Sequence, residues 1–207
     1  MERLDPEALR EHLAAGGRVV DVREPPVFAD AHLRGALNIA LSNRSAPYWL
    51  HVLVAPTERV AAVTATDREG PYAEQLLAAA ERSAAGFAPF DAEAFAASAL
   101  QIASFRTITP DELFEARDSL AVVDVREAQE YAAGHVPGAL WIPLEELSSR
   151  LGDVPAGPIA TICGSGFRSS SAAALLEAAG RSDLASVWGG TMAWIQLGYP
   201  VNQGQRP

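Results

Sequence analysis

Residues 19–41 and 122–144 are two copies of one segment. At a constant offset of 103 positions, 13 of the 23 residues are identical, including the whole of V-V-D-V-R-E. Self-similarity of this extent indicates a duplicated folding unit. Since the chain has 207 residues, each copy has the length of a small domain with its own core. We place the boundary near Ser104, which gives two domains, 1–103 and 104–207.

Each copy opens with the same helix start and continues as alternating strands and helices. Asp5-Pro6 in the first copy and Thr109-Pro110 in the second place a capping side chain before a proline, as at many helix starts. Short Val-rich strands, turns and amphipathic helices follow in both copies. Strands that alternate with helices indicate parallel βα units. We therefore expect an α/β protein, each domain a mostly parallel sheet flanked by helices.

The composition is that of a folded protein, and the charge pattern excludes several classes of partner. Apolar residues make up 49% of the chain and the net charge is −10. The basic residues are not clustered, which argues against nucleic acid. No apolar run approaches the roughly 20 residues of a membrane span. One cysteine cannot form an intramolecular disulfide, and the acidic start "MERLDPEALREHL" does not resemble a signal peptide, so we expect a cytoplasmic protein.

The single cysteine, Cys163, lies between an apolar strand and a glycine-containing loop that leads into a helix expected to begin near Ser169. Such a loop can point successive backbone N–H groups at an anion, and the helix start adds partial positive charge. Gly164 and Gly166 supply the backbone freedom, and Arg168 adds a cation. A thiolate is stabilised there, so Cys163 should be a nucleophile at neutral pH. The competing interpretation, a cysteine that only fills the core, leaves the glycines and the arginine unexplained.

These residues resemble a known family. The pattern C-x-x-G-x-R-S, preceded by D-V-R-E-x-x-E-Y-x-x-G-H-V-P-G-A and followed by V-W-G-G-T-M-A-W-I-Q-L-G-Y-P-V, resembles the rhodanese family of sulfurtransferases over residues 122–201. The resemblance implies that Cys163 takes a sulfane sulfur from thiosulfate or a small persulfide, holds it as a persulfide, and passes it to a thiol or to cyanide. It also implies a loop that binds the substrate, formed by Gly164, Ser165, Gly166, Phe167, Arg168 and Ser169.

The length and charge of the loop favour one kind of donor. Four residues separate Cys163 from Arg168, whereas related folds that act on phosphate or arsenate resemble this pattern with five. A tetrahedral oxyanion needs a wider ring of backbone N–H groups, so the shorter loop favours sulfur chemistry. Because the loop has no second cation, we expect weaker attraction for the thiosulfate dianion and a better fit to an organic persulfide such as glutathione persulfide. If Phe167 is exposed, it would contact the organic part of such a donor; the alternative is that Phe167 packs in the core.

The first copy has no cysteine at the matching place. Aligning the helices after the two loops gives an offset of 99, which places Thr64 at the position of Cys163 and Glu69 at that of Arg168. Asp67 and Glu69 would repel an anionic donor, so we expect this copy to be inactive. The pair most resembles the two rhodanese domains attached to persulfide dioxygenases of the metallo-β-lactamase fold. The zinc motif of such a dioxygenase, H-x-H-x-D-H, is absent from this sequence, and we expect no metal or other cofactor.

Residues present in both copies have a simpler interpretation, since one copy lacks the nucleophile. We expect a structural role for the histidines in the matching turns and for the acid and base that end the first strand, although Asp124 and Arg126 could also support the active loop from the same sheet edge. Two further histidines show no metal-ligand spacing. The residues concerned are His32 with His135, Asp21 with Arg23, Asp124 with Arg126, and the isolated His12 and His51.

The function expected from the sequence is therefore sulfur transfer through Cys163 between small sulfur donors and thiol acceptors. A rival of another class is a sulfur relay or regulatory module that docks on a partner enzyme of sulfur metabolism and does not turn over alone. A cysteine phosphatase or arsenate reductase is disfavoured by the loop length. Neither nucleic acid nor a membrane is expected as a partner.

Overall fold

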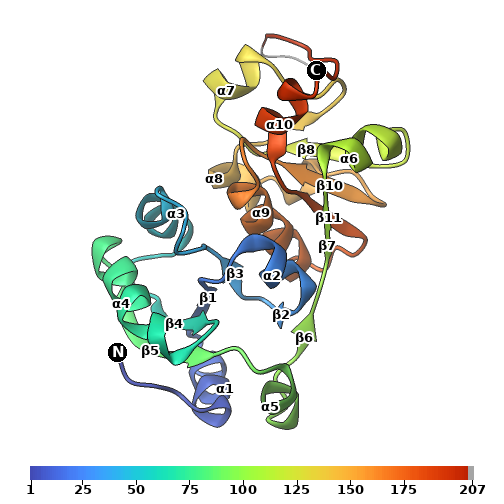
Figure 1. The fold of residues 1–207 in the computed structure, drawn as a ribbon. Coiled ribbons are helices and arrows are strands. Elements are labelled where there is room, and N and C mark those ends of the chain that lie inside the picture. Colours follow the sequence, from blue (N-terminus) through green and yellow to red (C-terminus); the bar gives the residue numbers. More distant parts are fainter. Residues whose placement is uncertain (205–207) are drawn as a thin grey trace. The chain divides into compact units, whose positions relative to one another are not determined.

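The computed structural model describes residues 1–204, which form two compact units: Met1–Ser104, and a second unit that begins at Phe105 (Figure 1). Each unit contains its own parallel sheet with helices packed against it. The expectation of an α/β protein with two such domains is confirmed.

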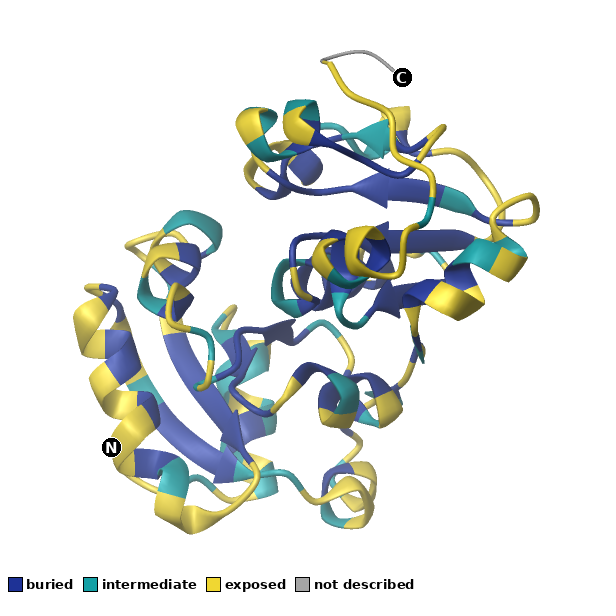
Figure 2. Ribbon diagram, turned by 45° about the horizontal axis from the view of Figure 1, so that its top comes forward, coloured by how far each residue is buried: buried dark blue, intermediate teal, exposed yellow. Residues whose placement is uncertain are grey.

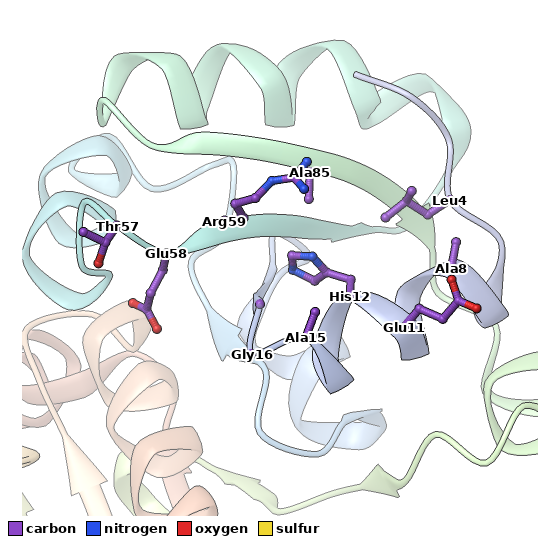
Figure 3. Close-up of a pocket in the computed structure, with 11 residues that line it drawn as sticks. Leu4, Ala8, Glu11, His12, Ala15, Gly16, Thr57, Glu58, Arg59 and Ala85 are labelled. Carbon is purple, nitrogen blue, oxygen red and sulfur yellow. The ribbon is translucent and has the colours of Figure 1, made fainter.

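The first unit is built on a four-stranded parallel sheet with the order β3-β1-β4-β5, and β2 and β6 form a separate antiparallel pair. Strands β4 and β5 run between α4 on one side and α1 on the other (Figure 3). The elements of this unit are α1 Pro6–Ala14, β1 Arg18–Asp21, α2 Pro25–Asp30, β2 His32–Leu33, β3 Leu37–Asn38, α3 Ala46–Leu53, β4 Arg59–Thr64, a 3-10 turn Asp67–Glu69, α4 Gly70–Ala79, β5 Ser83–Pro89, α5 Ala92–Ala97 and β6 Ile102–Ala103.

The second unit has a five-stranded parallel sheet with the order β7-β11-β10-β8-β9. Helix α9 packs on β10 and β11, and α10 packs on α6. The elements of this unit are β7 Arg106–Ile108, α6 Pro110–Ala116, β8 Ala121–Asp124, α7 Ala128–Ala133, β9 Leu140–Trp141, α8 Leu144–Leu147, a 3-10 turn Leu151–Asp153, β10 Ile159–Ile162, α9 Phe167–Ala178, β11 Leu184–Val187 and α10 Gly190–Gln196.

Local sequence signals account for the first helix of each unit. The Asp5 carboxylate accepts a hydrogen bond from the Ala8 amide at the start of α1. Thr109 and Glu112 form a reciprocal capping box at the start of α6. Both predicted helix starts are confirmed, because each places a side-chain oxygen where the first turn has unpaired N–H groups.

Two short strands were not apparent in the sequence. The segment around residue 104 shows no periodicity beyond its alanines, yet β6 and β7 lie on either side of Ser104. Each strand has only two or three residues. Strand β6 pairs with β2 and β7 pairs with β11, and both partners are distant in the sequence. Too few residues are present for an alternating pattern to show.

The central strands of each sheet supply the core of its unit. In β4 and β10 nearly every residue is buried, as expected for parallel strands covered on both faces, while the outer sides of the helices are exposed (Figure 2). Among residues 1–204, no helix combines the length and the apolar character needed to cross a membrane.

Candidate functional site

Cys163 begins a tight loop that joins β10 to α9 at the carboxyl edge of the second sheet. Gly166 precedes the helix with a φ of 114°, a left-handed conformation that glycine adopts without strain. The expected helix start near Ser169 is wrong by two residues, because Gly166 turns the chain directly into α9 at Phe167. Ser169 therefore belongs to the first turn of the helix and faces back toward the loop.

The sulfur of Cys163 lies at the base of this loop, with only 1% of the residue exposed. The Gly166 amide N–H donates to Sγ over 3.1 Å. The Cys163 S–H in turn donates to the Ser169 hydroxyl oxygen over 3.9 Å, and that hydroxyl donates to the Gly166 carbonyl over 2.9 Å. A backbone N–H that donates to a sulfur favours the anionic, nucleophilic form. The predicted site residues Cys163, Gly166 and Ser169 are thus brought together.

The carbonyl groups of the loop are held away from the sulfur by the start of α10. Because the C=O and N–H of a trans peptide point in opposite directions, the N–H groups that follow these carbonyls face the other way. Among the described residues, the amides of Gly164 and Ser165, which follow two of these carbonyls, have no hydrogen-bond acceptor, and neither has the Phe167 amide at the start of α9, so all three are available to an anion. The three bonds that hold the carbonyls are Thr191 N to Cys163 O at 2.7 Å, Met192 N to Gly164 O at 3.0 Å, and Gly189 N to Ser165 O at 3.1 Å.

The Arg168 guanidinium makes a two-point ion pair with the Glu130 carboxylate on α7, with both N–O distances 2.6 Å. Burial opposes the charged form of Arg168, but Glu130 and the nearby Cys163 outweigh it and raise the pKa of the guanidinium. Burial likewise opposes the charged form of Glu130, and Arg168 more than compensates, so the pKa of Glu130 is lowered. Arg168 thus brings little free positive charge to the loop.

Glu130 was not singled out from the sequence, although the duplication contains a signal that points to it. At the offset of 103, Glu130 matches Val27, and at the offset of 99, Arg168 matches Glu69. Both members of the ion pair are therefore absent from the first copy. Glu130 also stands in the D-V-R-E-x-x-E-Y pattern that precedes the loop motif, so its position in that pattern and its loss together with Arg168 in the first copy were the available signals.

Asp124 and Arg126 form a buried brace beside the loop. Their charged groups approach to 2.7 Å, and Arg126 also donates to the Gly134 carbonyl. In the first unit, Asp21 and Arg23 form the same pair at 2.6 Å. The same geometry in a unit without the cysteine supports a bracing role for both pairs.

The two matching histidines have similar surroundings. The ring Nδ1 of His135 contacts the Tyr131 carbonyl at 2.9 Å, and that of His32 contacts the Phe28 carbonyl at 2.8 Å. Each ring is buried and stacks on the aromatic ring four residues earlier. This arrangement ties each turn to the preceding helix, which supports the structural role expected from the sequence.

An aromatic pair lies next to the loop. The rings of Phe167 and Trp188 meet edge to face with centroids 5.5 Å apart, and both residues are partly exposed. Trp188 also closes over Gly166: a Cβ at that glycine would lie 2.5 Å from its ring. The pair offers an apolar surface beside the loop.

The first unit has a loop at the same place with a different content. In the first sheet Val63 lies opposite Asp21 on β1, and in the second sheet Ile162 lies opposite Asp124 on β8. The next residue along the chain is Thr64 in the first unit and Cys163 in the second, so these two occupy the same position. The Glu69 carboxylate accepts the Ala65 amide over 2.7 Å. In the first unit the Glu69 carboxylate therefore accepts a hydrogen bond from a loop amide, whereas the corresponding amide of the second unit has no acceptor among the described residues.

A surface hollow of about 660 Å³ lies at the opposite edge of the first sheet, at the amino ends of β1 and β4. His12 on α1 and Arg59 on β4 contribute to its lining, together with Glu11 and Glu58 (Figure 3). It contains no cysteine and lies at the opposite edge of its sheet from the loop that begins at Thr64. In the described part of the chain, no three His, Cys, Asp or Glu side chains gather as a metal site requires.

Comparison with known proteins identifies the family. The model of the rhodanese-like domain matches residues 5–89 and 109–197. The thiosulfate sulfurtransferase GlpE of Pseudomonas putida is 36% identical over 107 residues, which cover 50% of this chain and 96% of that protein. The probable adenylyltransferase/sulfurtransferase MoeZ of Mycobacterium tuberculosis is 38% identical over 108 residues, 49% of this chain and 28% of that protein.

Among solved structures, a rhodanese-related protein from Thermoplasma volcanium is similar with a TM-score of 0.46 and 33% identity, covering 48% of this chain and all of that one. The two matches to the family model together span most of the sequence, one in each unit. The chain belongs to the rhodanese family and consists of two rhodanese-like domains in tandem.

Proposed function

We propose that this protein is a sulfurtransferase that carries sulfane sulfur as a persulfide on Cys163. The observation that carries the proposal is the set of backbone groups around the sulfur. The Gly166 amide donates to Sγ, and backbone N–H groups at the start of α10 bind the loop carbonyls, which leaves neighbouring loop amides available to an anion. The curated relative GlpE is named a thiosulfate sulfurtransferase, and the match covers 96% of GlpE. The second unit is the catalytic one in this proposal, and the first is a structural or partner-binding copy.

The reaction has two displacement steps. The Cys163 thiolate attacks the outer sulfur of a donor R–S–SH; a new S–S bond forms, the old one breaks, and RS⁻ leaves with the electron pair. With thiosulfate, sulfite leaves instead. The thiolate of an acceptor, or cyanide, then attacks the outer sulfur of the persulfide, and Cys163 leaves as a thiolate. The loop amides stabilise the negative sulfur species in both steps.

An organic persulfide is the donor that the loop fits best. Arg168 is the one cation of the loop, and Glu130 neutralises it in a two-point pair. A dianion such as thiosulfate therefore finds little net positive charge. The Phe167–Trp188 pair provides apolar contact for the organic part of a donor. Glutathione persulfide combines one small sulfane group with an organic carrier and suits both features.

Intact-mass spectrometry after treatment with a donor tests the carrier role. We expect the protein to gain one sulfur atom, and we expect that mass to disappear on reduction and in Cys163→Ser. Failure of every sulfane donor to modify Cys163 would overturn the mechanism. Comparing kcat/KM for glutathione persulfide and thiosulfate tests the donor class, and a strong preference for thiosulfate would contradict it.

A relay that docks on a partner enzyme remains the second candidate, favoured by the deep burial of Cys163. The two functions differ in multiple turnover. A sulfurtransferase cycles many times with a small donor and a small thiol, whereas a relay takes up one sulfur and releases it only to its partner. Counting turnovers per protein molecule with purified components distinguishes them.

A further inference from the structure

Beneath the active loop, a chain of buried hydroxyl groups leads from the last strand to the catalytic sulfur. The Ser186 hydroxyl on β11 donates to the Ser169 hydroxyl oxygen over 3.0 Å, and Ser169 in turn lies 3.9 Å from Cys163 Sγ. All three residues are buried. Ser186 lies outside the loop motif, and the sequence alone gave no reason to consider it.

Ser186 controls which way the Ser169 hydroxyl can donate. A serine hydroxyl has one proton and two lone pairs. By donating to Ser169 Oγ, Ser186 fills one acceptor position, so the single proton of Ser169 turns away from Ser186. Gly166 O in the loop accepts it over 2.9 Å, and Val187 O on β11 is a more distant acceptor at 3.5 Å. While Cys163 is a thiol, its S–H donates to Ser169 Oγ over 3.9 Å. When the sulfur has lost that proton, its negative charge would draw the Ser169 hydroxyl proton from Gly166 O, and the bond from Ser186 would strengthen the donation.

The first unit shows that the fold does not need this pair. Ala62 on β4 and Thr161 on β10 occupy matching positions in the two sheets. The residue opposite Thr161 on the next strand is Ser186, and the residue opposite Ala62 is Phe87 on β5. Phe87 therefore occupies the position of Ser186. At the offset of 99, Gly70 stands in place of Ser169, and its missing side chain makes room for the Phe87 ring: a Cβ at Gly70 would lie 2.6 Å from it. An apolar ring over a glycine therefore replaces the two hydroxyls in the unit that lacks the cysteine.

We propose that Ser186 is a positioning residue for the Cys163 sulfur: it orients the Ser169 hydroxyl as a donor to the thiolate that exists before sulfur is loaded and again after it is transferred. The inference rests on the proposed function in that Cys163 is the reacting sulfur. The charged groups on the elements around the loop are paired or act on Arg168. Arg168 on α9 is paired with Glu130 on α7 and also interacts with the Glu127 carboxylate, Asp124 at the end of β8 is paired with Arg126, and α10 has no charged side chain.

The test follows the ionisation of the sulfur directly. Because the chain has one cysteine, the rate of alkylation by iodoacetamide reports on Cys163 alone at every pH. In full-length Ser186→Ala we expect the midpoint of the rate against pH to move upward and the rate at neutral pH to fall about three- to tenfold, as for loss of a hydrogen bond between neutral groups, because Ser186 reaches the sulfur only through Ser169. Ser169→Ala should show a shift at least as large. The double variant should match Ser169→Ala, because Ser186 acts through Ser169.

Two further variants separate positioning from packing. Ser186→Thr keeps the hydroxyl and should restore the midpoint. Thr107→Val is the matched control: Thr107 lies opposite Ser186 on β7, and its buried hydroxyl has no partner among the described residues, so the midpoint should not change. An unshifted midpoint in folded Ser186→Ala, or shifts that add in the double variant, would overturn the proposal. Alkylation does not require turnover, so these outcomes are distinct from a failure of sulfur transfer.

Discussion

Glu130 lies outside the loop but pairs with Arg168, the one cation of the loop. In the proposed function this pair sets the charge that the loop presents to a donor. Replacing Glu130 by glutamine removes the counter-charge of Arg168 and keeps the shape. In Glu130→Gln we expect kcat/KM for thiosulfate to rise about three- to tenfold relative to that for glutathione persulfide, because the guanidinium attracts the dianion more strongly. Steady-state kinetics with both donors measure this ratio.

Glu145→Gln is the control for this change, since it alters the net charge equally at an exposed carboxylate for which the described residues provide no partner. The ratio of the two donors should stay at its wild-type value there. A ratio unchanged in Glu130→Gln as well would contradict the assignment of the ion pair as the cause of donor preference.

The same ion pair makes stability depend on pH. The folded-state pKa of Glu130 lies below its usual value of 4.5, so the stabilisation is fully present above that pH and is lost as pH falls through the lowered pKa. We expect the pair to contribute about 1 kcal/mol, because the Glu130 side chain is 38% exposed and screened by solvent. Unfolding free energies of wild type and Glu130→Gln should therefore differ at neutral pH and converge in acid. A constant difference would contradict the linkage.

Gly166 combines a left-handed backbone with close contact to Trp188. We expect Gly166→Ala to destabilise the second unit by more than about 2 kcal/mol and to abolish sulfur loading, since the new Cβ would lie 2.5 Å from the ring. Gly138→Ala is the control: its φ is 78°, but no atom lies within 4 Å of the added Cβ, so only the backbone cost of about 1–2 kcal/mol applies. Equal losses in thermal unfolding would show that the contact with Trp188 is unimportant.

At the scale of the elements, the buried pairs that follow β1 and β8 hold the turns of both units. Removing one charge of a buried pair leaves the other uncompensated, so Asp21→Asn and Asp124→Asn should each cost about 3–5 kcal/mol in their own unit. At a temperature where the variants remain folded, we expect both to load sulfur on Cys163, because the pairs brace the turns. Unfolding curves and intact mass measure the two effects.

An Asp124→Asn variant as stable as wild type that no longer loads sulfur would contradict the bracing role and place Asp124 in the chemistry. Asp21→Asn is the internal control, since its pair has the same geometry in the unit without the cysteine. Similar losses of stability in the two variants are the result expected for a shared structural function.

The elements that the sequence could predict are those with a local cause. Proline after a capping residue fixed the start of α1 and α6, and runs of valine located β1 and β8. The start of α9 and the strand β7 were missed because their causes are not local. The first depends on the left-handed Gly166, and the second on pairing with β11, which comes some 80 residues later.

The site shows the same division. The motif predicted which residues form the loop, because backbone amides need only glycines and a helix start to gather at one sulfur. It did not predict that α10 holds the loop carbonyls, that Glu130 neutralises Arg168, or that Ser186 lies behind Ser169. Each of these contacts joins residues that only the folded sheet brings together.

At the scale of the whole molecule, the two units share one fold, and the second has Cys163 where the first has Thr64; the difference between the two sites extends beyond this residue. In the first unit Glu69 occupies a loop amide, and Gly70 with Phe87 replaces the hydroxyl pair. Moving the nucleophile alone should therefore not move the activity. We expect the full-length double variant Cys163→Ser, Thr64→Cys to gain no sulfur from glutathione persulfide under conditions that load the wild type completely.

Adding Glu69→Arg to this double variant removes the competing carboxylate but leaves the apolar wall of Gly70 and Phe87 under the sulfur. Loading should remain below about a hundredth of the wild-type rate, since the missing donors and a misplaced loop each cost at least tenfold. Intact mass at fixed times after donor addition gives the rates, and Cys163→Ser alone provides the background. Efficient loading of the new thiol in either variant would show that a cysteine at the end of the strand suffices, and that the amides, the ion pair and the hydroxyl chain of the second unit are not what makes Cys163 reactive.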